Sequence, residues 1–348
     1  MDDMIKKDLQ KQIECYLTHL TDASYYGTGT SFSKEPQIDL QETYNRVTSS
    51  KFRKTKITEE TEKDIKFKIE NCAQKRSPLQ FSVPFGAYKA WRLGLDFQPD
   101  WAEVFNISYH LKYAANILEV YPFGVEITYT FSDDLMYFVS DIPRDKARNY
   151  TIVFQKLLDI FNLVSEKIHF KLVEINSLYD SAESYYIDFL KCFLDNLIYW
   201  DTKYGEETKS RHLNSAHNNL FLYGERKIGE LDKSTQEKYF YYSALMTDAV
   251  DCLKERRKFN KDQDKIQLVG VKGPSKCINM GACETSTVHF WTGRGVIKFN
   301  KGKLKPYIFT HTNMQKLEGE NKTISLEVNT VFCKVSKNYQ NILFIQED

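Results

Sequence analysis

Basic residues follow a short strand-like run early in the chain. The run Leu79–Val83 stops at Pro84, and Tyr88, Lys89 and Arg92 come shortly after it. α/β enzymes bind anionic substrates where strands end, and a lysine whose pKa is lowered can form a Schiff base with a ketone. The pattern predicts a substrate site here, with Lys89 as a catalytic residue and Tyr88 and Arg92 as binding residues. The alternative is a solvated basic loop without a ligand.

Two acidic residues open the next helix-like segment. Asp100 and Glu103 follow Pro99 in the run PDWAEVF, and residues three apart share a helix face. A pair of carboxyl groups on one face can serve as a coupled acid and base, so both are predicted to be catalytic. The alternative is that they only stabilise the first turn, where the aligned peptide dipoles favour negative charge.

An Asp-Asp pair separates two further strand-like runs, Val125–Phe131 and Leu135–Val139. We predict that these runs form a hairpin and that Asp133 binds substrate. A β-turn, which favours aspartate for its own hydrogen bonding, explains the same residues without a ligand.

A fourth group of reactive side chains lies near the C-terminal part of the chain. Lys272 follows the strand-like run Ile266–Val271, and His289 and Arg294 bracket the sequence WTGRG. Arginine offers a planar fork for a carboxylate or phosphate, and Gly293 and Gly295 would let the backbone approach a ligand. We predict His289 as catalytic and Lys272 and Arg294 as substrate-binding. A hairpin with glycine turn chemistry is the alternative.

Composition excludes several other classes of protein. The 348 residues carry a formal net charge of +1 and no basic stripe, which argues against nucleic-acid binding and membrane-surface binding. GxGxxG after a strand, GxxxxGK[ST], HExxH and GxSxG are all missing. The seven cysteines are widely spaced without a CxxC pair, which is typical of free thiols in a reducing compartment. The charged N-terminus lacks an apolar signal core, so a cytoplasmic protein without a membrane partner is expected.

Strand-like and helix-like segments alternate through residues 76–275. Strands are predicted at Leu79–Val83, Val125–Phe131, Ile168–Ile175 and Ile266–Val271, with amphipathic helical segments between them. This alternation is typical of an α/β fold. We therefore predict a mostly parallel, Rossmann-like sheet flanked by helices as the catalytic domain.

The two ends of the chain differ from this middle part. Residues 1–75 are predicted to form an N-terminal helical segment and a mobile loop. Residues 276–348 hold short strand-like runs separated by turns, which predicts a small antiparallel β unit. These runs are Thr287–Trp291, Gly295–Phe299, Lys305–Phe309, Thr323–Val328 and Val331–Val335.

The order of motifs in residues 78–163 resembles the isocyanide (isonitrile) synthase family, which includes the pyoverdine/paerucumarin-type synthases and the fungal dityrosine biosynthesis protein. The likeness covers SVPFGAYKAWRLG, then PDWAEVFNISYHLKYAANILEVYPFGVEITYTFSDDLMYFVSDI, then RDKARNY. A weaker likeness covers YYSALMTDAVDCLKER and IQLVGV. After IQLVGV the chain departs from the expected His-Pro, because it has Lys272-Gly273-Pro274 there.

The resemblance implies an enzyme of secondary metabolism, a transferase or lyase. It would convert the α-amino group of an aromatic amino acid to an isonitrile, with ribulose 5-phosphate as the carbon donor and without a metal or organic cofactor. It also implies a downstream iron/2-oxoglutarate oxygenase as a partner in the same pathway. Two alternatives stay open: another α/β enzyme acting on a phosphorylated or carboxylated small molecule, and a non-catalytic binding protein on the same fold.

Overall fold

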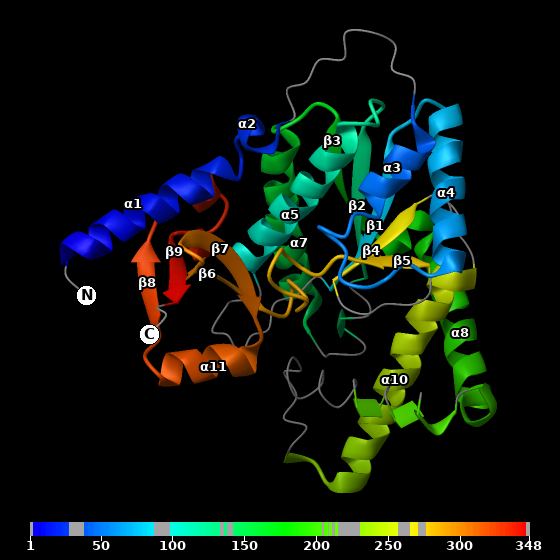
Figure 1. Cartoon of the computed structure of the whole chain (residues 1–348). Helices are drawn as coiled ribbons and strands as arrows, with labels where there is room; N and C mark the ends of the chain where they lie inside the picture. Colours follow the sequence, from blue (N-terminus) through cyan, green and yellow to red (C-terminus); the bar gives the residue numbers. More distant parts are fainter. Residues whose placement is uncertain are drawn as a thin grey trace.

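A five-stranded sheet, parallel throughout, forms the centre of the molecule, with the strand order β3-β2-β1-β4-β5 (Figure 1). Its strands are β1 Leu79–Pro84, β2 Val125–Phe131, β3 Ile168–Glu174, β4 Ile266–Val269 and β5 Cys277–Asn279. The computed structural model describes residues 3–27, 38–86, 98–132, 136–137, 142–203, 205–207, 209–210, 213–214, 230–256, 265–270 and 276–345.

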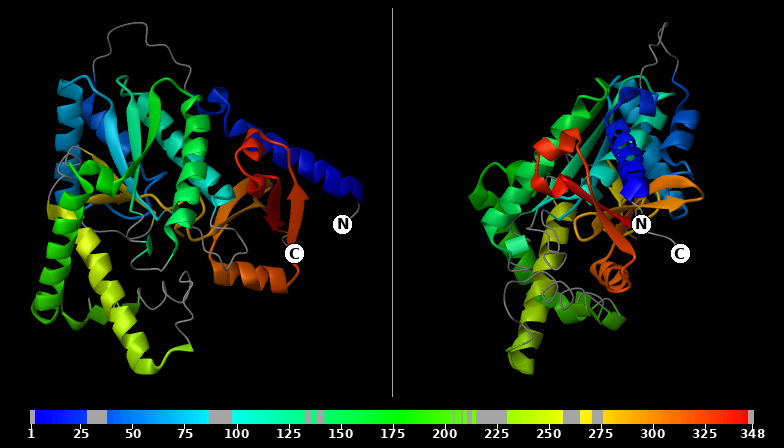
Figure 2. Two further views of the ribbon diagram at one scale, coloured as in Figure 1. Left: turned by 180° about the vertical axis from the view of Figure 1, so that it is seen from behind. Right: turned by 90° about the vertical axis from the view of Figure 1, so that its left-hand side faces the viewer.

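Helices connect successive strands and cover the sheet. α5 (Trp101–Leu118) joins β1 to β2, and α7 (Arg144–Asn162) joins β2 to β3. Figures 1 and 2 show these two helices on the opposite side of the sheet from α4 (Glu59–Gln74), which precedes β1 and packs beside α3 (Leu40–Val47). The predicted α/β fold with a parallel, helix-flanked sheet is confirmed.

Two long helices pack against each other between β3 and β4. They are α8 (Ala182–Lys203) and α10 (Lys233–Arg256), and Figure 1 shows them extending away from the sheet. Buried apolar side chains hold the two together in two clusters, which include Tyr185, Phe189 and Ala249 in one and Trp200 and Leu245 in the other. No helix in the described ranges is long and apolar enough to cross a membrane.

A second, four-stranded sheet lies beyond α5 in the order β7-β6-β9-β8 (Figure 1). β6 pairs with β7 and β8 with β9 in antiparallel fashion, whereas β6 and β9 are parallel, so this sheet is mixed. The N-terminal helices run beside it. The elements are β6 Arg294–Asn300, β7 Lys303–Phe309, α11 His311–Gly319, β8 Thr323–Glu327, β9 Asn341–Ile345, α1 Asp3–His19 and α2 Ala23–Tyr26.

Several predicted strands are absent from the described structure. The segment 287–291 forms turns rather than a strand, and Val331–Lys334 is a 3₁₀ helix (η5). The prediction of a hairpin after β2 is wrong. Both neighbours of β2, β1 and β3, are parallel to it, and Met136 and Tyr137 lie in a helical turn. The sequence analysis missed α11, β9 and β5, and β5 extends the large sheet past residue 275.

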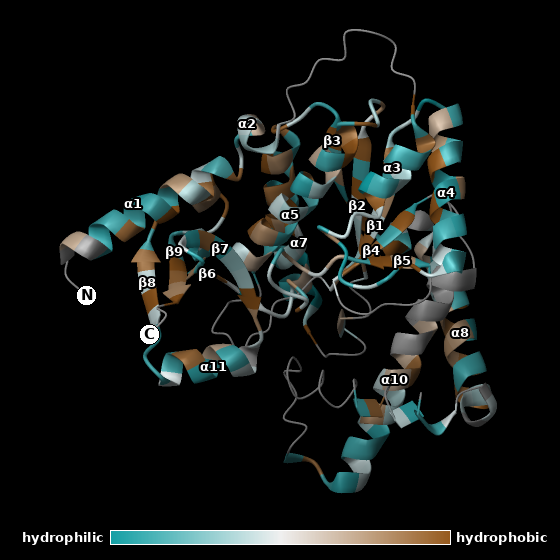
Figure 3. Ribbon diagram, viewed as in Figure 1, coloured by the Kyte–Doolittle hydropathy of each residue, from teal (hydrophilic) through white to brown (hydrophobic). Residues whose placement is uncertain are grey.

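α5 lies between the two sheets and is almost wholly buried. Every residue of α5 except Lys112 and Asn116 is buried. Figure 3 shows hydrophobic residues concentrated in the large sheet, while α1, α3 and α4 carry hydrophilic residues on their outer faces. At the first turn of α5, Trp101 Nε1 donates a hydrogen bond of 2.8 Å to the carbonyl of Asn341 at the start of β9.

Gly295 marks the closest approach of the second sheet to α5. A Cβ at this position would lie 2.2 Å from the Ala102 nitrogen and 2.4 Å from the Trp101 carbonyl carbon, both backbone atoms. The backbone of β6 can therefore touch the first turn of α5 only because residue 295 has no side chain. We expected Gly295 to let the backbone approach a ligand, but it lets the backbone approach helix α5 instead.

We expect Gly295→Ala to lower the free energy of unfolding by about 3 kcal/mol or more, because backbone cannot yield to the added methyl group. Gly319→Ala is the matched control, since a Cβ at Gly319 meets nothing within 4 Å, and its effect should stay within about 1 kcal/mol. Urea denaturation of both variants measures the difference. Equal stabilities would contradict the close contact between β6 and α5.

Candidate functional site

The carboxyl ends of β1, β2 and β4 lie at one edge of the large sheet because the strands are parallel. The chain order reverses between β1 and β4: β2 and β3 add on one side of β1, and β4 and β5 add on the other. In open α/β sheets, ligands bind outside the carboxyl ends at such a reversal point. After each of these three strands the described chain continues for one or two residues, as far as Gly86, Ser132 and Gly270 respectively.

Aromatic side chains cover this edge. The ring of Phe85, which directly follows β1, lies 5.7 Å from the ring of Phe131, 5.7 Å from that of Phe290 and 6.1 Å from that of Trp291. Phe154 of α7 lies 5.0 Å from Phe85. These five residues, which we name the aromatic cluster, pack against one another as an apolar wall beside the reversal point.

His289 stands next to the aromatic cluster and next to the end of β4. Its ring centre lies 4.2 Å from that of Trp291, and its Nδ1 lies 3.9 Å from where a Cβ on Gly270 would be. Among the described residues, this buried nitrogen has no hydrogen-bond partner. Burial lowers the pKa of His289 to about 4, so the imidazole is neutral near pH 7. The Nδ1 atom of His289 is thus a buried polar atom beside the end of β4 that no described residue satisfies.

A buried polar network lies behind the aromatic cluster. His110 Nδ1 lies 2.7 Å from the Tyr129 hydroxyl, which donates a hydrogen bond of 3.1 Å to Asn106 Oδ1. Asn106 Nδ2 in turn donates to the Ala282 carbonyl at 2.7 Å. The Tyr129 ring packs 5.9 Å from Phe85, so the network fixes the wall from behind.

The sequence analysis missed this network. Asn106 and His110 are four residues apart on a helix that is otherwise mostly apolar, and that spacing was the available signal. Burial lowers the pKa of His110 to about 3, which keeps the imidazole neutral.

Asp100 and Glu103 form a capping box at the start of α5. The Asp100 carboxylate accepts hydrogen bonds from the nitrogens of Ala102 (2.9 Å) and Gly295 (3.2 Å). The Glu103 carboxylate accepts from the Asp100 nitrogen at 2.7 Å and from the Tyr150 hydroxyl at 2.8 Å. The alternative of helix stabilisation therefore accounts for these contacts. The predicted catalytic role of the pair stays a prediction.

Arg294 lies near Asp100 rather than near His289. Arg294 and Asp100 line a hollow between the start of α5 and the second sheet, together with Ser325 and Asn338. The Arg294 guanidinium forms an ion pair with Glu318 of α11 at 3.3 Å. The structure thus brings two predicted site residues together. The substrate-binding role of Arg294 stays a prediction.

Five predicted site residues lie outside the described residues: Tyr88, Lys89, Arg92, Asp133 and Lys272. In the sequence they follow Gly86, Ser132 and Gly270, the last described residues after β1, β2 and β4. Their roles also stay predictions.

Comparison with solved structures identifies the fold. The PvcA protein of Pseudomonas aeruginosa superposes on 88% of this chain and 100% of its own, with a TM-score of 0.62 and 13% sequence identity. The chain has the fold of PvcA. No protein-family model matches the sequence, and no curated protein matches it either.

Two more distant structural matches have TM-scores below 0.5 and support no argument. A tyrosyl-tRNA synthetase of Archaeoglobus fulgidus, complexed with L-tyrosine, covers 67% of this chain and 56% of its own at 18% identity and a TM-score of 0.33. A CDPS of Fluoribacter dumoffii covers 78% of this chain and 91% of its own at 9% identity and a TM-score of 0.30.

The buried histidine of the network should make stability depend on pH. The native pKa of His110 is about 3, below the ordinary value of about 6.5, so unfolded chains bind a proton that native chains do not. Its contribution is complete above about pH 6.5 and is lost as the pH falls towards 3. We expect this residue alone to lower the free energy of unfolding by about 2 kcal/mol between pH 7 and pH 5.

His110→Gln should remove the part of this dependence that comes from His110 and leave the part that comes from His289, because glutamine keeps hydrogen-bonding capacity but does not titrate. His169→Gln on β3 is the control, since His169 is exposed, and it should keep the wild-type dependence. Urea unfolding at pH 7, 6 and 5 measures all three proteins. Identical curves for wild type and His110→Gln would refute a neutral, buried His110.

Proposed function

We propose that this protein is an isonitrile synthase-like enzyme. It converts the α-amino group of an aromatic amino acid to an isonitrile and takes the added carbon from ribulose 5-phosphate. The observation that carries the proposal is the fold that this protein shares with PvcA over the full length of PvcA. PvcA is of the pyoverdine/paerucumarin isonitrile synthase-like type. The motifs in residues 78–163 resemble the same family, so two separate lines of reasoning agree.

The aromatic cluster supports the choice of amino acid. Phe85, Phe290 and Trp291 pack against one another at the carboxyl edge of the sheet. Aromatic side chains prefer edge-to-face or offset contacts with other rings and gain about 0.5–1.5 kcal/mol from each beyond simple burial. A tyrosine or tryptophan side chain would therefore bind here better than an aliphatic one.

The first chemical step needs an unprotonated amine. The amine nitrogen adds to the ketone carbon of the sugar phosphate, and loss of water gives an imine with a new C–N double bond. A neutral His289 can accept a hydrogen bond from the amine or, in its other tautomer, donate one to the ketone oxygen. With a pKa of about 4, His289 orients and polarises these groups rather than storing a proton.

The substrate carboxylate and phosphate require cationic partners. We propose Lys89, Arg92 and Lys272 for this role, because each follows a strand that ends at this edge of the sheet, with Tyr88 and Asp133 as further substrate-binding residues. Asp100, Glu103 and Arg294 lie around the start of α5. For Asp100 and Glu103 we propose a role in holding the edge in place through Gly295 and Tyr150, and for Arg294 we keep the substrate-binding role predicted from the sequence.

Turnover of purified protein tests the proposal directly. Ribulose 5-phosphate should be consumed with tyrosine or tryptophan and not with alanine, and mass spectrometry should detect the isonitrile product. Chelator should leave the rate unchanged, since the resemblance implies no metal. If no amino acid among the twenty supports consumption of the sugar phosphate, the proposal fails, and binding of other phosphorylated or carboxylated metabolites becomes the next measurement.

His289→Gln should lower kcat at least ~10-fold, because an aligned hydrogen bond to the reacting amine or ketone is lost. The thermal midpoint should hardly change, because the Nδ1 atom has no partner among the described residues. His169→Gln is the control for the substitution itself. An unchanged kcat in His289→Gln would remove His289 from the catalytic residues while leaving the substrate assignment open.

A further inference from the structure

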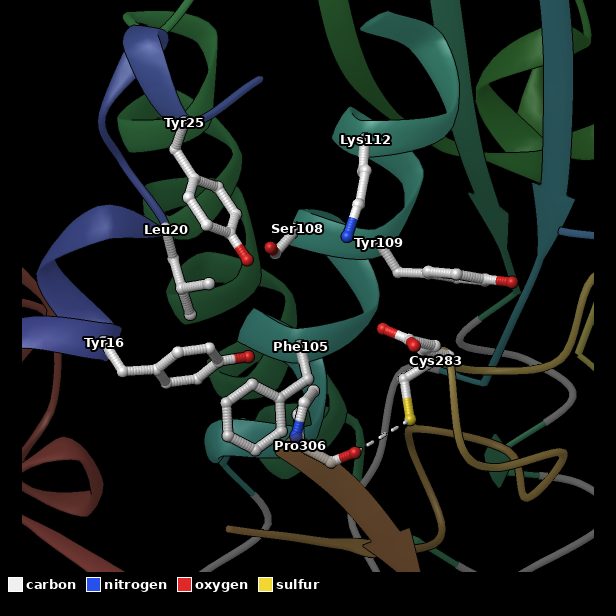
Figure 4. Close-up of a pocket in the computed structure, with 10 residues that line it drawn as sticks. Tyr16, Leu20, Tyr25, Phe105, Ser108, Tyr109, Lys112, Cys283 and Pro306 are labelled. Atoms are coloured by element: carbon white, nitrogen blue, oxygen red, sulfur yellow. Dashed lines mark hydrogen bonds between the residues drawn. The ribbon is translucent and has the colours of Figure 1, made fainter. Parts of the chain in front are cut away.

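A second hollow lies between the N-terminal helices and the body of the protein (Figure 4). α1 contributes Tyr16, α2 contributes Tyr25, and α5 contributes Phe105, Tyr109 and Lys112. Cys283, Glu284 and Pro306 complete the lining. None of these residues takes part in the aromatic cluster or the network behind it.

Three hydrogen-bond donors point into this hollow without a partner. Figure 4 shows the Tyr16 and Tyr25 hydroxyls and the Lys112 ammonium directed towards its centre from three different helices. Within the described part of the chain, none of the three forms a hydrogen bond or an ion pair. Burial raises the pKa of Tyr16 well above its usual value and also raises that of Tyr25, so both hydroxyls keep their protons.

Positive charge exceeds negative charge around the hollow. The Glu284 carboxylate is already matched by Lys305, whose ammonium lies 2.7 Å away. Lys54 donates a hydrogen bond of 2.8 Å to the Glu284 backbone carbonyl, and Lys54 and Lys112 also help to lower the pKa of the Glu284 carboxyl through their charges. The single carboxylate is thus surrounded by three ammonium groups. A cation would meet two or more ammonium groups here, whereas an anion would meet three donors and a net positive field.

We propose that this hollow binds an oxyanion, the phosphate or carboxylate group of a small metabolite, held by Tyr16, Tyr25 and Lys112. The rings of Phe105 and Tyr109 would flank the attached carbon skeleton. The site is separate from the carboxyl edge of the large sheet and does not rest on the function proposed above.

A ligand bound at this site would stabilise the packing of α1 and α2 against the rest of the protein. At present the Tyr26 hydroxyl contacts Ser108 Oγ at 2.8 Å, and Glu14 Oε1 accepts from the Asn329 nitrogen at 2.9 Å. A ligand that bridges Tyr16, Tyr25 and Lys112 adds a third contact between these helices and the rest of the protein. Because a ligand that binds only the docked state stabilises that state, amide hydrogen exchange in α1 and α2 should slow when the site is filled.

Calorimetric titration with inorganic phosphate and, separately, with acetate tests the proposal on the full-length protein. We expect wild type to bind at least one of the two anions, and the better ligand identifies phosphate or carboxylate as the natural group. Lys112→Gln should weaken binding at least ~10-fold, as expected for loss of a charge-assisted contact. Tyr16→Phe should weaken it several-fold without lowering the thermal midpoint, because its hydroxyl has no partner to lose.

Two controls carry the same substitutions elsewhere. Lys191→Gln and Tyr199→Phe change exposed side chains of α8 and should bind the anion as wild type does. His289→Gln should also bind as wild type, which separates this site from the proposed active site. Equal affinity in wild type, Lys112→Gln and Tyr16→Phe would overturn the proposal, and so would the absence of any heat from either anion.

Discussion

The buried carboxylates at the start of α5 hold the molecule's two sheets together. Glu103 is fully buried, and a carboxyl group in that position is tolerated only when hydrogen bonds replace its lost water. Those bonds come from the Asp100 nitrogen and from Tyr150 on α7, while Asp100 binds the Gly295 nitrogen at the start of β6. One capping box thus joins α5, α7 and the second sheet.

This junction determines how firmly the carboxyl edge is held. Tyr150 connects Glu103 to the aromatic cluster, because its ring packs 6.1 Å from Phe154 and 6.4 Å from Phe85. On the other face of the cluster, the Tyr129 hydroxyl is held by Asn106 and His110 of the same helix α5. A single enclosed helix therefore positions the wall from two sides, and His289 and Trp291 are placed against a rigid support.

The sequence sufficed for the α/β sheet because β1, β2, β3 and β4 are apolar runs bounded by turn residues. It failed in the second sheet, where Thr287–Trp291 and Val331–Val335 have strand-like composition. The backbone there instead turns at His289 and forms a 3₁₀ helix after Thr330, and tertiary contacts decide such short segments.

For the site, residue type pointed to His289, whose catalytic role stays a prediction, but not to the aromatic rings and the polar network beside it. Spacing placed Asp100 and Glu103 on one helix face, yet only coordinates show that Tyr150 and Gly295, distant in sequence, bind them. The contribution of Gly295 could not be foreseen, because a close approach to backbone leaves no pattern in a single sequence. The network of Asn106, His110 and Tyr129 was hidden for a similar reason, since its third member lies on another element.

The position of β4 in the sheet has a consequence for biosynthesis. β1 lies between β2 and β4, but β4 follows β1 by about 180 residues. On a ribosome that adds roughly 5–20 residues each second, β1 emerges on the order of ten to forty seconds before β4. During that interval one edge of β1 lacks its permanent neighbour and can pair with another chain. The nascent protein is therefore most exposed to misassembly while α8 and α10 are being made, and a chaperone would act to greatest effect in that window.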